Sequence, residues 1–271
     1  MAIFNENSRV KIPAILHLCR LGYTYLNHSQ EKYDKDTNIF TKVFEESIKR
    51  INNADPDIDT NKLLQEISLK LDNDDLGKEF YNIITANSGT KLIDFNNFEN
   101  NSFHVVTELT YKNGEDEFRP DITVLINGMP LVFIEVKKPN NHEGVLAERD
   151  RINTRFKNPK FKKFINISQI LIFSNNMPYD SESIEPIQGA YYSTTSFSKA
   201  IFHYFRDEEK LDQNILKPVD DTVENIVLKD NNLTTIKYSP EFITNKDINT
   251  PTNSIITSLL CKERLAFLLK Y

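Results

Sequence analysis

The sequence predicts an α/β protein with a mixed central β-sheet flanked by helices and with a helical N-terminal region. Apolar residues recur at helical spacing through residues 1–100, whereas residues 119–137 hold two nearly continuous apolar runs joined by Asn-Gly. Such runs are typical of a β-hairpin that is buried on both faces, near the centre of a sheet. Helical and strand-like segments then alternate up to residue 205, which favours a sheet covered by helices.

The composition is that of a globular protein of 271 residues, 39% of them apolar and 27% charged, which allows one large domain or two small ones. No segment approaches the roughly 18 apolar residues that span a membrane. The first residues also lack the basic and apolar regions of a signal peptide. Cys19 and Cys261 follow no spacing motif, as expected of reduced core residues. We therefore expect a cytoplasmic protein with no membrane partner.

The N-terminal region should be helical. Apolar periodicity predicts four helices there, over residues 12–21, 38–51, 59–71 and 77–84. The first has Pro13 in its first turn and Gly22 just past its end, where helices prefer these residues. Asp59 or Thr60 can cap the start of the third.

Three charged residues stand out in the apolar hairpin: Asp121, Glu135 and Lys137. Charged side chains are rarely buried unless they are paired or bind a metal, so this group is the first candidate for a functional site. Because side chains alternate between the two faces of a strand, Glu135 and Lys137 share a face. Whether Asp121 joins them depends on the connection between the two strands.

The length of that connection decides which face Asp121 takes. A two-residue Asn-Gly loop would turn its carboxylate away from Glu135, since directly opposed residues share a face. A three-residue loop over residues 127–129 would place Asp121 opposite Glu135. We therefore predict an odd-length connection, with Gly128 at a bulge position of positive φ.

Two carboxylates and a lysine on one face form a site for a hard cation. Oxygen ligands suit Mg²⁺ or Mn²⁺, and Mg²⁺ takes one or two carboxylates, with water and substrate phosphates as the remaining ligands. A cation held by Asp121 and Glu135 can activate a nucleophilic water and stabilise the charge that develops on a phosphodiester. Lys137 can orient that water, deprotonate it or neutralise the phosphate, and the sequence leaves these roles open.

The pattern P-D-x(13)-E-x-K on a hairpin resembles the motif of PD-(D/E)xK nucleases. The longer string over residues 119–139, R-P-D-I-T-V-L-I-N-G-M-P-L-V-F-I-E-V-K-K-P, resembles the restriction (R, HsdR-type) subunit of type I restriction-modification enzymes. The resemblance implies a restriction-endonuclease-like fold in which Asp121, Glu135 and Lys137 are catalytic. It also implies that Asp121, Glu135 and the Val136 carbonyl are metal ligands.

The resemblance further implies how the chain is organised. Residues 1–205 would form the nuclease domain, with a helical region over 1–100 and a catalytic α/β core over 101–205. Residues 206–271 would form a linker and a helix that lead to an ATP-driven DNA motor. ATP would act only through that motor, since no G-x-x-x-x-G-K-[S/T] phosphate loop occurs in this chain.

The implied activity is that of a type I site-specific deoxyribonuclease, which cleaves double-stranded DNA with Mg²⁺ or Mn²⁺. In this family a separate specificity subunit recognises the sequence and works with a methyltransferase subunit, so we expect no sequence preference in this chain. One alternative is a standalone PD-(D/E)xK repair or recombination nuclease, against which the longer string argues. Another is a DNA-binding or assembly module that does not cleave, against which the intact Asp121, Glu135 and Lys137 argue.

Many PD-(D/E)xK enzymes carry an acidic residue on an early helix that reaches the metal. Glu45 and Glu46, beside the apolar stripe of the second expected helix, are the candidates here, with a solvated helix surface as the alternative. After the hairpin, a helix is expected over residues 143–156. Type I restriction subunits usually carry Q-x-x-x-Y on this helix, but residues 151–156 contain neither glutamine nor tyrosine, so no role is carried over to it.

Positive charge is concentrated after the hairpin. Residues 149–163 carry a net charge of +6, while the whole chain carries −6, so the remainder carries −12. Neutralisation of DNA phosphates by such a segment would make binding strongly dependent on salt. We expect its basic residues to contact DNA, with a solvated charged face as the alternative: Arg149, Arg151, Arg155, Lys157, Lys160, Lys162 and Lys163.

Further elements complete the expected fold. Strands are expected over residues 103–111 and 165–174, and helices over residues 194–205 and 255–269. In the first of these strands, His104 and Glu108 share a face that we expect to be exposed to solvent. Residues 206–252 are charged and weakly periodic, as expected of a linker.

Overall fold

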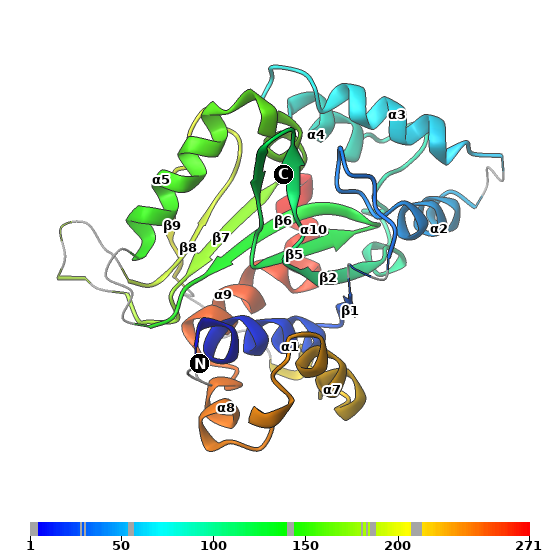
Figure 1. The fold of residues 1–271 in the computed structure, drawn as a ribbon. Helices are drawn as coiled ribbons and strands as arrows, with labels where there is room; N and C mark the ends of the chain where they lie inside the picture. Colours follow the sequence, from blue (N-terminus) through cyan, green and yellow to red (C-terminus); the bar gives the residue numbers. More distant parts are fainter. Residues whose placement is uncertain are drawn as a thin grey trace.

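The computed structural model of the chain describes residues 5–27, 29, 31–53, 57–139, 144–179, 181–182, 184, 188–206 and 213–271, and Figure 1 shows their arrangement. Within these residues the fold is mixed α/β, as predicted, with a seven-stranded sheet flanked by helices. The strand order is β1-β2-β5-β6-β7-β8-β9, and β3 and β4 form a separate two-stranded sheet. The pairs β1–β2 and β6–β7 are parallel, and the other neighbours are antiparallel.

The strands are β1 (Thr24–Leu26), β2 (Phe103–Thr107), β3 (Tyr111–Asn113), β4 (Asp116–Phe118), β5 (Ile122–Ile126), β6 (Met129–Val136), β7 (Ile170–Ser174), β8 (Ala190–Ser193) and β9 (His203–Tyr204). The α-helices are α1 (Ile12–Arg20), α2 (Thr41–Ile51), α3 (Thr60–Lys70), α4 (Lys78–Ile84), α5 (Gly144–Lys157), α6 (Lys162–Ile167), α7 (Asp221–Asp230), α8 (Pro240–Asn245), α9 (Pro251–Leu260) and α10 (Lys262–Lys270). A π-helical turn, η1 (Asn7–Lys11), precedes α1. The 3-10 turns are η2 (Phe98–Asn100), η3 (Pro159–Phe161), η4 (Gln213–Ile215) and η5 (Thr234–Ile236).

Different helices cover the two faces of the sheet (Figure 1). On one face, α1 and α9 share a core with alternate residues of β5 and β6 such as Val124 and Ile134. On the other, α5 and α6 share a second core with Phe133. Because side chains alternate along a strand, Glu135 lies on the same face as Phe133, under α5.

The four helices expected in the N-terminal region are present as α1 to α4. Gly22 follows α1 with a φ of +90°, a left-handed conformation that glycine adopts without steric cost. Asp59 caps α3, since its carboxylate accepts hydrogen bonds from the backbone N–H groups of Asn61 and Lys62. Local signals at the helix ends therefore marked α1 and α3, while α2 begins at Thr41 rather than residue 38.

The connection between β5 and β6 is shorter than predicted. Ile126 pairs with Met129, so the loop has two residues, and the three-residue loop was wrong. Asn127 and Gly128 have φ values of +49° and +79°, which is the pattern of a type I′ turn. This turn matches the twist of the two strands without an extra residue.

The odd residue that the prediction required lies within β6, at Leu131. The pairing register shifts between Val124 and Leu125, whose partners are Val132 and Pro130. The bulge reverses the alternation between the turn and the open end of the hairpin. It therefore has the same effect on the charged residues as the longer loop would have had.

The Asn127-Gly128 turn is hydrogen-bonded to the start of α2. The Gly128 carbonyl accepts a hydrogen bond from the Phe40 backbone N–H at 2.9 Å, just before α2 begins. Asn127 is fully buried, and its side chain donates to the Leu92 carbonyl at 2.8 Å and accepts from the Ser102 N–H at 2.8 Å. The turn end of the hairpin thus has its buried polar groups paired.

Two elements after the hairpin differ from the expectation. Residues 162–167 form α6, and only residues 170–174 form the strand β7. Residues 194–205, all of them described, form no helix, and the stretch ends in the short strand β9. Phe197 is 57% exposed, so the apolar spacing there did not mark a buried helix face. Serine and threonine, frequent in this stretch, compete with helix formation by binding nearby backbone.

The C-terminal segment forms α7 to α10, and Ile256 and Leu265 join the core that contains α1. The single helix expected over residues 255–269 is divided into α9 and α10, because the backbone of Cys261 is extended (φ −61°, ψ +140°). The division of the chain into a nuclease domain and a linker stays a prediction. In the described part of the chain, none of the helices is long and apolar enough to traverse a bilayer.

Candidate active site

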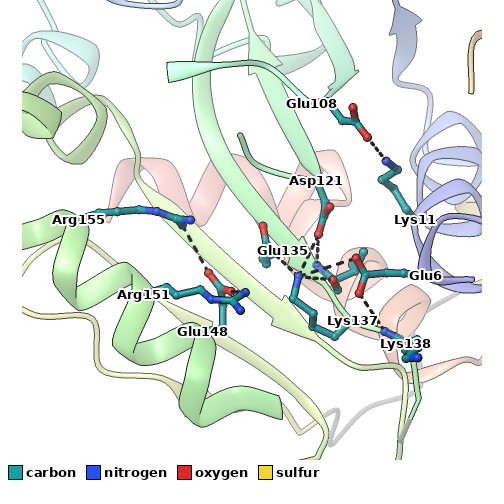
Figure 2. A network of polar contacts seen from close by, with 11 residues as sticks. Glu6, Lys11, Glu108, Asp121, Glu135, Lys137, Lys138, Glu148, Arg151 and Arg155 are labelled. Atoms are coloured by element: carbon teal, nitrogen blue, oxygen red, sulfur yellow. Dashed lines mark hydrogen bonds and ion pairs between the residues drawn. The ribbon is translucent and has the colours of Figure 1, made fainter. Parts of the chain in front are cut away.

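Asp121, Glu135 and Lys137 lie together at the open end of the hairpin, on the face that α5 covers (Figure 2). Lys137 Nζ lies 2.6 Å from Glu135 Oε1 and 3.7 Å from Asp121 Oδ2. Ile122 pairs with Ile134, so the residues that flank this pair on the open side, Asp121 and Glu135, also face each other. The structure therefore brings the three predicted residues together, although through a bulge rather than a longer loop.

Backbone contacts position the aspartate. The Val136 N–H donates to Asp121 Oδ2 at 2.9 Å, and the Glu108 N–H donates to the Asp121 carbonyl at 3.2 Å. Glu108 has a φ of +53°, which is uncommon outside glycine and clusters at functional sites. Its carboxylate contacts the buried Lys11 at 2.5 Å and the exposed Arg119 at 3.3 Å. Since β2 ends just before Glu108, this residue does not lie on the exposed strand face that the sequence predicted.

The buried Glu135 has a strongly raised pKa. Burial, together with the charge of Asp121, raises the pKa of Glu135 to about 8. Glu148 acts in the same direction, and Lys137 acts against it. Among the described residues, the buried Oε2 of Glu135 has no hydrogen-bond partner. A carboxylate oxygen in this state is costly unless a cation or a proton comes to it.

A third carboxylate reaches the site from the residue just before η1. Glu6 Oε1 lies 3.9 Å from Lys137 Nζ, and Glu6 Oε2 accepts the Lys138 N–H at 3.3 Å (Figure 2). Burial raises the pKa of Glu6, while Lys137 lowers it and Asp121 raises it. Glu6 was not predicted from the sequence, because it lies outside the apolar pattern that predicted the helix over residues 12–21.

Glu45 and Glu46, the acids predicted to reach the site, do not do so. Both are exposed on α2, and Glu45 pairs with Lys49 at 2.6 Å. Helix α2 packs over the turn at Gly128, whereas the site lies at the other end of the strands, roughly 20 Å away at the usual rise per strand residue. An early segment does supply an acid, but it is Glu6, just before η1, rather than a residue of α2.

The side chains present at the site fit a hard divalent cation. The oxygen donors are the Asp121 and Glu135 carboxylates and the Val136 carbonyl, which lies 3.0 Å from Lys137 Nζ. No three His, Cys, Asp or Glu side chains within the described ranges are grouped closely enough to hold a metal by themselves. Mg²⁺ commonly takes only one or two carboxylates and keeps water for the remainder. Such an ion would satisfy Glu135 Oε2, which has no partner in the part of the chain that the structure describes.

The predicted DNA-binding segment divides into two groups. On α5, Arg151 and Arg155 both contact the buried Glu148, each at 3.5 Å. Arg149 contacts Asp150 at 3.3 Å, and Lys157 is exposed. Of the segment, Arg151 and Arg155 are therefore the part that lies beside the carboxylates of the site (Figure 2).

The second group consists of the lysines around α6, which are neutralised by aspartates far away in the sequence. These pairs are Lys160 with Asp116 at 3.0 Å, Lys162 with Asp74 at 2.7 Å, and Lys163 with Asp72 at 3.2 Å and with Asp36. A local count of charge cannot reveal such partners. The +6 segment is thus not one continuous basic surface, and contact with DNA stays a prediction.

Residues 3–179 match the family model described as Type I restriction enzyme R protein N terminus. The chain belongs to this family. Among its relatives, the type I restriction enzyme MjaIXP endonuclease subunit of Methanocaldococcus jannaschii is 29% identical over 65% of this chain. The MjaVIIIP endonuclease subunit of the same organism is 32% identical over 33% of the chain. The matched parts make up 19% and 9% of those two proteins, so the chain corresponds to a small part of each.

Proposed function

We propose that this chain is the Mg²⁺-dependent DNA endonuclease domain of a type I restriction enzyme, and that it hydrolyses phosphodiester bonds without a sequence preference of its own. Membership of the R protein family supports the proposal, as do the relatives named as endonuclease subunits. The observation that carries it is the meeting of Asp121, Glu135 and Lys137 on one face of the hairpin.

In this proposal, Asp121, Glu135 and the Val136 carbonyl hold the cation, for which Mn²⁺ can replace Mg²⁺. When bound, the cation supplies Lewis-acid chemistry, since it lowers the pKa of a coordinated water and offsets negative charge on the phosphate. The raised pKa of Glu135 means that metal binding competes with a proton at this residue. The Val136 N–H keeps the Asp121 carboxylate in place at 2.9 Å.

Lys137 serves as a cation rather than as a base. Burial lowers its pKa, but Glu135 and Asp121 outweigh burial and hold the pKa above its usual range. A protonated lysine can orient the attacking water and neutralise phosphate charge, but it cannot take up the proton of that water. Glu6, with its raised pKa and its position 3.9 Å from Lys137 Nζ, is the better candidate for the base.

The remaining activities of a type I enzyme lie outside this chain in the proposal. An ATP-dependent motor would move double-stranded DNA, and specificity and methyltransferase subunits would provide recognition and modification. The small share of the relatives' length that the chain matches supports this division of labour. The chain would then act as the cleavage module of a multisubunit type I site-specific deoxyribonuclease.

The test is substitution in the complete enzyme. Asp121→Asn, Glu135→Gln and Lys137→Ala should each lower the cleavage rate by about 1000-fold or more, because each removes a charge at the reacting centre. ATP hydrolysis should persist, since these residues belong to no nucleotide site. Glu45→Gln is the matched control, exposed and remote, and should cleave at the normal rate. Cleavage by the Glu135→Gln enzyme would contradict the proposal.

Calorimetric titration with Mn²⁺ tests the ligands separately from cleavage. Asp121→Asn should weaken Mn²⁺ binding by about tenfold or more, the size of effect expected when a ligand loses its charge. Lys137→Ala should not weaken it, because the ammonium is a competitor for the carboxylates and not a ligand. Unchanged Mn²⁺ affinity in Asp121→Asn would refute the ligand assignment.

A further inference from the structure

A buried glutamate, Glu148, lies on α5 beside the candidate active site and contacts two arginines (Figure 2). The Glu148 side chain is 1% exposed, and its two oxygens contact two arginines. Oε1 lies 3.5 Å from Arg155 Nη1, and Oε2 lies 3.5 Å from Arg151 Nη1. A buried carboxylate loses its hydration, so a pair of this kind contributes little to stability by itself. Its place next to the reacting carboxylates points to a role at the site.

Arg155 is held in a defined position but keeps donors for another ligand. Its side chain is 16% exposed, and its guanidinium carbon lies 4.3 Å from the ring centre of Phe118 and 5.9 Å from that of Phe133. The contact with Glu148 uses Nη1 at the outer limit of hydrogen-bond distance. Because a guanidinium carries five N–H donors, a second oxygen ligand can be bound as well.

The guanidinium also lies within the electrostatic reach of the site. Burial lowers the pKa of Arg155, and Glu148 opposes that effect. Glu135 and Asp121 oppose it too, which agrees with their place beside Arg155 in Figure 2. The carboxylates therefore have Lys137 directly among them and Arg155 on the side of α5.

We propose that Arg155 binds an oxygen of the DNA phosphate at the cleavage site, and that Glu148 is the positioning residue that aims it. A phosphate seated beside Asp121 and Glu135 would meet this guanidinium on the side opposite the strands. Arginine suits the contact, because its planar fork matches the oxygens of a phosphate. The inference rests on the proposed nuclease function and adds the group that recognises the phosphodiester.

The sharing of Glu148 by two arginines explains how Arg155 can engage DNA. If Arg155 were the one cation near Glu148, its movement toward a phosphate would leave a buried carboxylate unpaired, which is strongly unfavourable. Arg151 contacts the other oxygen of Glu148 and is 53% exposed, so it can remain as the partner. The second arginine thus allows the first to divide its hydrogen bonds between protein and DNA.

Arg155→Met in the complete enzyme tests the phosphate contact, because methionine keeps an unbranched chain over Phe118 and removes the charge. We expect cleavage to fall about 100-fold, as for loss of one donor to a reacting oxyanion. The slope of log affinity for DNA against log salt should shrink by about 0.9, the value for one phosphate contact. Mn²⁺ affinity should be unchanged. Lys62→Met, an equal loss of charge on the exposed face of α3, should alter none of these quantities.

Glu148→Gln tests the positioning role. We expect kcat to fall about tenfold with little change in KM, because the phosphate still binds but the guanidinium is less well aimed. In the double variant with Arg155→Met the two losses should not multiply, since both act through one group. Losses that multiply would overturn the role of Glu148. If Arg155→Met fails to fold, Arg155→Lys replaces it, with partial cleavage and a normal salt slope as the expected result.

The inference is overturned if Arg155→Met cleaves at the normal rate with an unchanged salt slope. Where methionine is not tolerated, cleavage by Arg155→Lys at the full normal rate overturns it. Failure of the underlying function looks different. In that case Glu135→Gln would still cleave DNA, whatever the behaviour of the Arg155 variants. The two results are therefore separable in one set of assays.

Discussion

The two ends of the β5–β6 hairpin are built on opposite principles. At the turn end, Asn127 is fully buried with its amide groups paired, and the Gly128 carbonyl is bonded to the start of α2. At the open end, three carboxylates surround Lys137, and a buried oxygen of Glu135 has no partner among the described residues. The polar groups of the turn end are thus hydrogen-bonded and closely packed, whereas the open end carries charges in an unfavourable environment.

This difference indicates how the hairpin can carry a reactive site at all. Buried charges in an unfavourable environment lower stability, so a fold keeps them only if other parts of the molecule stabilise it enough. Here the turn end and the two cores on the sheet faces supply that stability. We therefore expect substitutions at the turn to change stability and substitutions at the open end to change function.

The largest stability effect is expected at Gly128. A Cβ there would lie 2.7 Å from the Phe40 carbonyl oxygen and 2.8 Å from the Phe44 nitrogen, and the residue has a φ of +79°. Gly128→Ala should therefore lower the free energy of unfolding by about 3 kcal/mol or more, through strain and overlap with backbone atoms. Urea denaturation measures this change.

Gly114→Ala is the control for that experiment. Gly114 also has a positive φ, +65°, but an added Cβ meets no described atom within 4 Å. We expect a loss of only about 1 kcal/mol, the cost of the left-handed conformation alone. Equal losses in the two variants would mean that packing against α2 contributes nothing to the turn.

The second expected effect on stability concerns the opposite face of the sheet from the site, where α1 packs against α9. Burial, with a smaller contribution from Arg20, lowers the pKa of His17 from 6.5 to about 3, and its Nε2 lies 2.6 Å from Thr257 Oγ1. Because the unfolded chain then binds more protons than the folded one between these values, stability is lost as the pH falls below 6.5. The loss from this group between pH 7 and pH 5 should be about 2 kcal/mol.

His17→Asn removes the titration and keeps a group that can bond Thr257. Thermal or urea unfolding at pH 7 and pH 5 should show that the normal chain loses about 2 kcal/mol more than this variant. His104, whose pKa burial lowers to about 4, contributes equally to both chains and cancels in the comparison. Parallel pH profiles for the two chains would refute a buried neutral His17.

The last effect is on rate rather than stability, and it sharpens the contrast between the two ends of the hairpin. Glu6→Gln should reduce the cleavage rate about 100-fold, the lower end of the range for loss of a positioned base, because Glu6 faces Lys137 at the site. Glu45→Gln makes the same change on exposed α2 and should alter neither cleavage nor, beyond about 0.5 kcal/mol, stability. A normal rate in Glu6→Gln would remove this residue from the site.

Much of the fold followed from local signals in the sequence. Apolar periodicity and capping residues such as Asp59 placed the N-terminal helices, and the buried runs placed β5 and β6. The charged residues of the hairpin were found because charge is exceptional in such runs. Their common face was predicted correctly, since any odd insertion between them has that effect. Where the insertion lay could not be read from the sequence, and it proved to be Leu131 rather than the loop.

The errors lie where tertiary contacts decide the outcome. Glu6 belongs to no pattern, and only its tertiary contacts with Lys137 and with the Lys138 N–H place it at the site. The lysines around α6 looked free in the sequence, but Asp36, Asp72, Asp74 and Asp116 neutralise them from distant segments. The interruption at Cys261 is likewise invisible in an unbroken apolar pattern.

The unpaired residue in the middle of β6 restricts how this ribbon can change its length. Loss or gain of one amino acid between Asp121 and Glu135 would move one of the two acids to the opposite face of the sheet, into the apolar core against α1. A change of two would return both to the same side. The number of residues between the two acids can therefore vary in steps of two. Whether that number is odd or even decides if the acids share a face, and its size matters less.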